Sequence, residues 1–292
     1  MSEANPSSQV AYVASRRVGD ATVTVISDGS LHWAPHFPVP EAEWRAAMPE
    51  ADAAGRVAFG LNVVLIQTPD AVVLVDPALD DPGSAFDAEF SRSVNVEIVR
   101  TPGFAAGLRE KGVAPEAVDH VVITHAHGDH YAGVTFERDG ELRVRLPHAR
   151  HWLGRADWEG SPGGKRASLE RDRRLGAVAD LGVLELVDGE REFAPGVSLL
   201  PSPGESPGHL AVRLQSAGER CYVLGDLIHH ACEVEHPDWA PPGRDLAALR
   251  ASRDRLYAEI AGAGALAVSA HEPFPAWGRI VSTASGYRWE PA

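Results

Sequence analysis

Short apolar runs alternate with turn-forming stretches along most of the chain, and this pattern predicts a protein rich in β-strands. Residues 61–68 and 71–76 are two such runs separated by Pro69-Asp70, which is a typical hairpin signal. The second half repeats the pattern with shorter runs. We expect further strands at residues 22–26, 121–123, 142–146, 149–153, 183–187, 197–200, 210–215, 221–224 and 266–269.

Helical periodicity is strongest in residues 245–261, where Leu246, Leu249, Leu256 and Ile260 fall on one side. Shorter helices are expected at residues 41–48, 104–111 and 155–158. A flexible break at 161–164 precedes a charged segment, 165–175, which predicts a solvated helix. Residues 82–103 show no clear period, and we interpret them as an irregular insertion with one short strand.

Composition narrows the class of protein. The chain has 292 residues, 44% of them hydrophobic, and a formal net charge of −14, which argues against nucleic acid or an anionic membrane as a partner. There is no signal-like N-terminus and no apolar run long enough to span a membrane, so we expect a soluble, cytoplasmic protein.

The length of the chain also suggests how it is divided. We expect an N-terminal extension at 1–20 and a single domain at 21–292. We expect free or core thiols at the two cysteines.

Residues 124–133 read T-H-A-H-G-D-H-Y-A-G and carry three histidines and an aspartate within six positions. The segment follows the predicted strand at 121–123, so the cluster lies where a strand ends. Neutral imidazole and carboxylate are ligands that zinc prefers, whereas burying three imidazoles beside an acid without a metal would be costly. We therefore predict a metal site, rather than a loop merely rich in histidine, formed by His125, His127, Asp129 and His130.

Three later strand ends are also followed by histidine or aspartate. The predicted strands at 197–200, 221–224 and 266–269 lead to His209, Asp226 and His271. Each signal is weak alone, because such a histidine is usually structural and such an aspartate usually belongs to a turn. Open sheets, however, build their sites at the carboxyl ends of strands. Together the segments supply five histidines and two aspartates, enough for two metals with an open position between them.

The chain resembles the metallo-β-lactamase superfamily of hydrolases in four segments, which are H-A-H-G-D-H at 125–130, S-P-G-H at 206–209, G-D at 225–226 and A-H at 270–271. The resemblance implies an α/β fold, a four-layer αββα sandwich with a dinuclear site in a cleft at one edge. It implies two divalent metal ions, with zinc favoured over manganese, cobalt or iron. The implied ligands are His125, His127 and His209 for one metal, Asp129, His130 and His271 for the second, and Asp226 as the bridge.

The segments G-D-L-I-H-H at 225–230 and H-P-D-W at 236–239 resemble the branch of methyl parathion hydrolase and the acyl-homoserine lactonases. That branch implies hydrolysis of small lactones, esters or phosphotriesters, and related enzymes suggest a homodimer. Two divalent ions lower the pKa of a shared water to about 7, so a metal-bound hydroxide can attack. Asp129, Asp226 and His229 are the candidate catalytic residues. His229, which stands where the best-known lactonases have tyrosine, is a candidate proton donor or oxyanion contact, with a structural role as the alternative.

Other residues are candidates for supporting roles. The proline-rich stretch 31–40 predicts a loop that is either a packed surface crossing or a pocket wall, through His32, Trp33, His36 and Phe37. Thr124 and Asp76 are candidates to orient ligand imidazoles.

Three alternatives stay open. A phosphodiesterase or nuclease of the same superfamily is disfavoured by the acidic composition, and a glyoxalase II-like or persulfide dioxygenase-like member by the absence of a basic C-terminal module. A non-catalytic, metal-stabilised binding protein would need a closed four-coordinate site, whereas seven ligands for two ions leave open positions.

Overall fold

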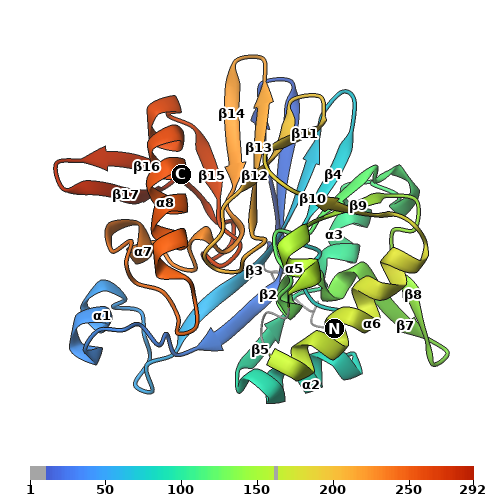
Figure 1. Cartoon of the computed structure of the whole chain (residues 1–292), viewed down its shortest axis with the longest axis horizontal. Helices are drawn as coiled ribbons and strands as arrows, with labels where there is room; N and C mark the ends of the chain where they lie inside the picture. The colour runs from blue at the N-terminus through green and yellow to red at the C-terminus, as the bar shows by residue number, and fades with distance from the viewer. Residues whose placement is uncertain (1–10, 161–163) are drawn as a thin grey trace, which may run out of the picture.

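Two β-sheets packed face to face form the centre of the molecule, with helices on both outer sides (Figure 1). The computed structural model describes residues 11–160 and 164–292. Within them, the first sheet has the order β1-β2-β3-β4-β6-β9-β10, and β5 pairs with β2. Its strands are β1 (Val13–Val18), β2 (Ala21–Trp33), β3 (Val57–Gln67), β4 (Val72–Val75), β5 (Glu97–Arg100), β6 (His120–Val122), β9 (Arg150–Gly154) and β10 (Leu184–Val187).

The second sheet comes from the second half of the chain and runs in sequence order. Its strands are β11 (Arg191–Ala194), β12 (Val197–Pro201), β13 (Leu210–Ser216), β14 (Glu219–Val223), β15 (Leu266–Val268), β16 (Trp277–Thr283) and β17 (Gly286–Pro291). A separate hairpin joins β7 (Thr135–Arg138) to β8 (Glu141–Val144). The helices are α1 (Glu41–Ala47), α2 (Ala85–Val94), α3 (Phe104–Glu110), α4 (Gly128–Tyr131), α5 (Arg155–Glu159), α6 (Gly164–Asp180), α7 (Cys232–Glu235) and α8 (Leu246–Ala263).

Three buried apolar clusters hold the layers together. Between the sheets, Val25 and Val75 of the first pack in one cluster with Val212 and Val223 of the second. A second cluster joins the outer face of the first sheet to α3 and α6, and a third joins the outer face of the second sheet to α8. Since burial of apolar surface is the main favourable term in folding, these three interfaces stabilise four layers. The predicted αββα sandwich is confirmed.

The structure differs from the sequence-based expectations in several places. Residues 82–103 are not irregular, because they contain α2, which begins after Ser84, whose hydroxyl accepts from the Asp87 amide. Helix α6 is not fully solvated: the Arg174 side chain is buried and pairs with Asp80. Strand β2 extends through Trp33, so the predicted loop at 31–40 starts three residues later than expected.

Strand β1 lies within the range 1–20 that we expected to be an extension, yet it pairs with β2 over its whole length. Residues 1–10, and the expected break at 161–164 except for its last residue, lie outside the described residues. Both cysteines, Cys221 and Cys232, are free and buried. Among the helices of the described part of the chain, none is long and apolar enough to cross a membrane.

Candidate metal centre

Loops that follow several strand ends meet at one edge of the two sheets. After β6 the chain enters the segment with His125 and His127, and the short helix α4 carries Asp129 and His130. From the second sheet, the loop after β12 carries His209, the turn after β14 carries Asp226 and the turn after β15 carries His271. Strands β4, β6 and β9 are parallel in the first sheet, and β14 and β15 are parallel in the second, so within each sheet their carboxyl ends lie at one edge.

The predicted bridging residue, Asp226, lies between two groups of candidate ligands. Its Oδ2 is 3.4 Å from His125 Nε2, whereas its Oδ1 is 3.2 Å from His130 Nε2 and 3.1 Å from His271 Nε2. Asp129 Oδ2 is 3.8 Å from the Nε2 atoms of His130 and His271. Each carboxylate oxygen of Asp226 therefore faces a different group.

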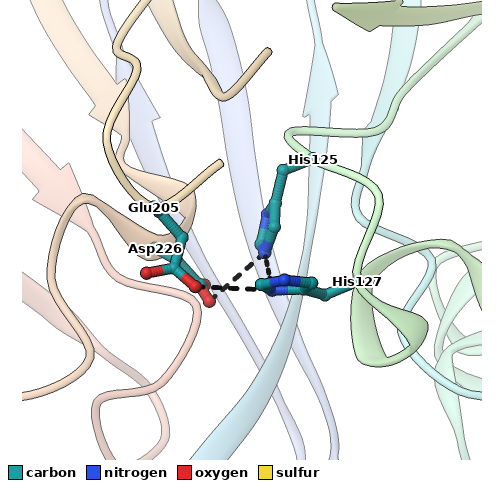
Figure 2. A group of neighbouring side chains, drawn as sticks. All are labelled: His125, His127, Glu205 and Asp226. Carbon is teal, nitrogen blue, oxygen red and sulfur yellow. Dashed lines mark hydrogen bonds and ion pairs between the residues drawn. The ribbon is translucent and has the colours of Figure 1, made fainter. Parts of the chain in front are cut away.

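Figure 2 shows the first of these groups, in which His125, His127 and Asp226 are joined by Glu205. The ligand atoms of these four side chains all lie within 4.8 Å of one another, and the same holds for Asp129, His130 and His271 in the second group. His125 Nε2 is 2.8 Å from His127 Nδ1. The two rings thus present the nitrogens that could share one cation.

A chain of hydrogen bonds orients the imidazoles of His125 and His130. Thr124 Oγ1 donates to Asp76 Oδ2 over 2.8 Å, so it accepts from His125 Nδ1, 3.1 Å away. Asp76 Oδ2 also accepts from His130 Nδ1 over 2.9 Å. With Nδ1 donating to a fixed acceptor, each ring directs its Nε2 toward the site, which is the orientation expected of a metal-binding histidine. Thr124 and Asp76 therefore lie where their predicted orienting role requires.

The two histidines from the second sheet follow the same rule. His271 Nδ1 donates to Gly60 O over 2.8 Å, and His209 Nδ1 lies 2.8 Å from Ser202 Oγ and 3.1 Å from Ser202 O. His209 Nε2 accepts from the Asp226 amide over 2.9 Å, so its one lone pair is engaged there, and the predicted ligand His209 is not among the four side chains of the first group, where Glu205 lies instead. Gly225 allows this approach: its φ is +53°, and a Cβ there would lie 2.7 Å from His209 Nε2.

Buried atoms without partners test whether this site suits cations. Of the buried side-chain atoms of the described residues that lack a hydrogen-bond partner, His130 Nε2 and Asp226 Oδ1 lie in this site. Leaving such groups unsatisfied costs about 1–3 kcal/mol each, so a native site of this kind calls for a ligand. Both atoms belong to residues of the two groups of neighbouring ligands, and nitrogen and oxygen donors fit zinc and its neighbours in the first transition series. The side chains present therefore fit two divalent ions.

The electrostatics of the site divide its candidate ligands. Burial lowers the pKa of His130 and of His271, but Asp226 and the neighbouring aspartates outweigh burial and raise both above the ordinary value, so a metal would displace a proton from each ring. Burial raises the pKa of the Asp226 carboxyl, but His130, His271, His125 and His229 together lower it well below its ordinary value, so the group is an anion. Burial, followed by the neighbouring His130, lowers the pKa of His125 well below its ordinary value and keeps that ring neutral. Anionic carboxylate and neutral imidazole are the forms that bind metals.

His229, the predicted proton donor, lies at the edge of the second group. Its Nε2 is 3.3 Å from Asp226 Oδ2, and its ring is stacked on that of His271 with centroids 5.7 Å apart. On the other side, its Nδ1 is 3.3 Å from Glu233 Oε1. Glu233 is itself paired with the fully buried Arg253, which also donates to the carbonyls of Leu227, Pro237 and Trp239. This network holds the His229 ring in one orientation.

A cavity of about 380 Å³ opens onto the candidate metal centre. Its polar side consists of His127, Asp129, Asp226, His229 and His271, with Arg244 at the margin. We call the apolar part of its lining the apolar wall, which is formed by Leu31, Trp33, Phe59, Phe90, Val94 and Val96.

Of the four candidate pocket residues in the stretch 31–40, Trp33 lines this cavity. His36 and Phe37 line a neighbouring cavity of about 600 Å³ instead. His32 lines neither of these two cavities.

Three residues of the site escaped the sequence-based reasoning. Glu205 lies in a loop of prolines and glycines with no histidine beside it, and Arg244 precedes a helix. Buried Asp157 accepts from the Ala126 amide, from Ser206 Oγ and from the Gly208 amide, and so ties the first motif to the loop of His209. The spacing S-P-G-E-S-P-G, with a lone acid between two tight turns, was the available signal for Glu205.

Most of the chain matches one known protein family. Residues 57–261 match the metallo-beta-lactamase superfamily. A probable metallo-hydrolase of Mycobacterium tuberculosis, Rv2300c, is 28% identical over 193 residues, which cover 59% of this chain and 59% of that protein. The chain thus spans about three fifths of the length of these curated relatives.

Solved structures share the fold along nearly the whole chain. AidC, a dizinc quorum-quenching lactonase in complex with a product, superposes with a TM-score of 0.79 at 20% identity, covering 97% of this chain and 98% of AidC. The hydrolase AbOPH of the beta lactamase superfamily superposes with a TM-score of 0.74 at 23% identity, again covering 97% and 98%. At these identities the likeness shows the fold.

Proposed function

The chain belongs to the metallo-beta-lactamase superfamily, and from that premise we propose that it is a dinuclear metal-dependent hydrolase of small, neutral lactones, esters or phosphotriesters. The observation that carries the proposal is the position of Asp226, which offers one carboxylate oxygen to each of two ligand groups. A structural metal site would be closed and four-coordinate. This one borders a cavity, which favours catalysis.

Seven side chains would hold the ions. His125 and His127 would bind the first, and Asp129, His130 and His271 the second, with Asp226 shared between them. The resemblance assigns His209 to the first ion as well, which requires that its Nε2 release the Asp226 amide. When bound, two divalent ions would supply Lewis acidity toward the electrophilic oxygen of the substrate and would lower the pKa of a water toward about 7. Zinc fits this set of nitrogen and oxygen donors, and manganese, cobalt and iron fit it as well.

His229 is the side chain best placed to assist the leaving group. It lines the cavity, its Nε2 lies beside Asp226, and Glu233 holds its opposite edge. A proton held at Nε2 can be given to an alkoxide or phenolate as the bond to the carbonyl carbon or phosphorus breaks. Asp226, whose oxygens both face candidate ligands, is less suited to that task.

The cavity suits a small and uncharged substrate with an apolar portion. Its volume of about 380 Å³ is near the lower end of ordinary ligand pockets. The net charge of −14 disfavours an anionic substrate such as a nucleic acid. The likeness to AidC, whose complex contains an acylated homoserine product, supports a lactone within this class.

A test combines metal content with a substrate screen. The purified protein is assayed for metal per chain by mass spectrometry and then offered γ-lactones, aryl esters, phosphotriesters and bis-aryl phosphates. We expect two divalent ions per chain and turnover of at least one neutral substrate. Turnover confined to bis-aryl phosphates would favour a phosphodiesterase instead, and two bound metals without any turnover would favour a non-catalytic binding protein.

A further inference from the structure

Glu205 and Arg244 form a salt bridge at the margin of the candidate metal centre. Arg244 Nε is 2.6 Å from Glu205 Oε2, and Arg244 Nη2 is 2.5 Å from Glu205 Oε1. The Glu205 side chain is fully buried, whereas that of Arg244 is 22% exposed. Such a two-pronged contact fixes both the place and the plane of a guanidinium group.

The loops that carry the pair are joined to each other. The Asp245 amide donates to Gly204 O over 3.0 Å, and Ser252 Oγ donates to Pro203 O over 2.7 Å. Gly204 has a φ of +137°, and a Cβ there would lie 2.2 Å from Leu249 Cα. The loop of Glu205 therefore packs directly on the first turns of α8, just after Arg244. The pair is held in place before any ligand arrives.

Arg244 retains hydrogen-bonding capacity toward the cavities. Its Nη1 makes one long hydrogen bond, 3.5 Å to Pro242 O, among the contacts of the described residues. Arg244 lines both the cavity over the metal centre and the neighbouring cavity of about 600 Å³, and it is the one arginine or lysine among the described residues that line the former. A guanidinium has five N–H donors, so two-pronged binding to Glu205 leaves others free.

We propose that the Glu205–Arg244 pair is a substrate-positioning site, in which Arg244 donates through Nη1 to an uncharged carbonyl oxygen that is not part of the bond being hydrolysed. This proposal rests on the proposed function, because it places that second carbonyl a few bonds from the scissile group. The paired carboxylate of Glu205 balances the charge of Arg244. The site therefore favours a neutral acceptor over an anion.

A competing role for Glu205 is binding of the first metal. Its Oε1 is 3.4 Å from His127 Nδ1, and it belongs to the same group of neighbouring ligand atoms. Against this role, both of its oxygens already lie within 2.6 Å of Arg244 nitrogens. The Glu205→Gln variant separates the two roles, since loss of one metal per chain would make Glu205 a ligand and overturn its assignment as the anchor of Arg244.

The main experiment uses two esters that differ in one group. Phenyl 4-oxohexanoate carries the extra carbonyl and phenyl hexanoate does not, and the ratio of their kcat/KM values is measured for the metal-loaded protein. We expect Arg244→Gln to lower this ratio about 10- to 100-fold, mainly through KM, because one hydrogen bond to a charged donor is lost. Arg244→Lys keeps the charge but loses the planar, two-pronged donor geometry of the guanidinium. Its ratio of kcat/KM values should lie between those of the unmodified protein and of Arg244→Gln.

Arg250→Gln is the matched control, since this exposed arginine lies on α8 and pairs with Asp238 and Asp254. It should leave the ratio as in the unmodified protein. If the ratio of kcat/KM values is unchanged in Arg244→Gln, including the case in which both esters lose activity equally, the proposal is overturned. Arg244 would then have only a structural role.

Binding keeps this test separate from that of the proposed function. The ethers 4-oxohexyl phenyl ether and hexyl phenyl ether cannot be hydrolysed by the same reaction, and their affinities are measured by calorimetry. We expect the keto ether to bind about 10-fold more tightly, and this preference to disappear in Arg244→Gln. If no ester is hydrolysed but the preference holds, the hydrolase assignment fails while the recognition site stands. Equal affinities would overturn the recognition site itself.

Discussion

The metal-binding side of the cavity and its apolar wall are built in different ways. On the metal-binding side, the Nδ1 atoms of His130 and His271 each donate to a fixed oxygen, so both rings are held in direction as well as in place. The apolar wall is held by packing alone, and Val94 within it is 45% exposed. Hydrogen bonds fix angles, whereas apolar contacts only exclude water. We infer that the first side determines the chemistry and the wall determines which substrates enter.

The largest expected effect comes from Asp226→Asn. The variant keeps the shape of the side chain but removes the negative charge that both ligand groups face. We expect loss of one of the two metals and a fall in kcat/KM of about 10³-fold or more, because a charge that stabilises the transition state is removed. Metal per chain and steady-state rates measure both effects. The exposed Asp180→Asn is the control, and near-normal rates with two metals retained would contradict the shared position of Asp226.

His229→Phe tests whether the metal-binding side includes a proton donor. Phenylalanine can keep the stacking on the His271 ring but cannot hold a proton. We expect kcat to fall about 10²-fold with both metals retained, as is typical for loss of a general acid. The loss should be largest for substrates with poor leaving groups, such as alkyl esters. Unchanged kinetics on the best substrate would remove His229 from the mechanism, and exposed His148→Phe should leave kcat unaltered.

Asp76 and Thr124 test whether orientation matters apart from ligation. Asp76→Asn places an amide where a carboxylate accepts from His130 Nδ1 and from Thr124 Oγ1. We expect metal affinity, measured by competition with a chelator, to fall about 10- to 100-fold, with activity restored by excess metal. Thr124→Val should lower the metal affinity by less than Asp76→Asn does. Thr124→Ser keeps the hydroxyl and should leave the metal affinity unchanged. An affinity unchanged in both Asp76→Asn and Thr124→Val would mean that ligand side chains alone place the ions.

The metal-binding side could be foreseen from the sequence because each of its histidines and acids follows a short apolar strand. Parallel strand ends in one sheet meet at one edge, so positions distant along the chain, such as Asp226 after β14 and His271 after β15, could be assigned to one place. Glu205 could not be found in this way, because a single acid between prolines and glycines is usually part of a turn. Its role depends on Arg244, and only the packing of its loop on α8 brings the two together.

The apolar wall could not be foreseen, because its members come from β2, β3 and the region 85–96, which share no motif. Helix α2 was missed because Pro82 and Gly83 precede it and because acids, serines and an arginine separate its apolar residues. Phe86, Phe90 and Val94 nevertheless recur every four residues, and Ser84 provides an N-cap. That spacing indicates a helix. Nothing in the sequence of the helix, however, indicates that the helix lies beside a metal site.

The smallest effect is expected from Phe90→Ala in the wall. A Cβ added at Gly128 would lie 2.9 Å from Phe90 Cε2, so the ring packs directly over the backbone between two candidate ligands. If the wall only holds the apolar arm of the substrate, removing the ring should raise KM about 10-fold for phenyl hexanoate and much less for phenyl acetate, because only the longer arm loses buried area. Val99→Ala, an exposed apolar residue that does not line the cavity, should change neither KM. Equal losses of kcat on both esters, together with loss of metal, would instead mean that Phe90 supports the backbone of the metal-binding side. The division between the two sides would then not hold at this residue.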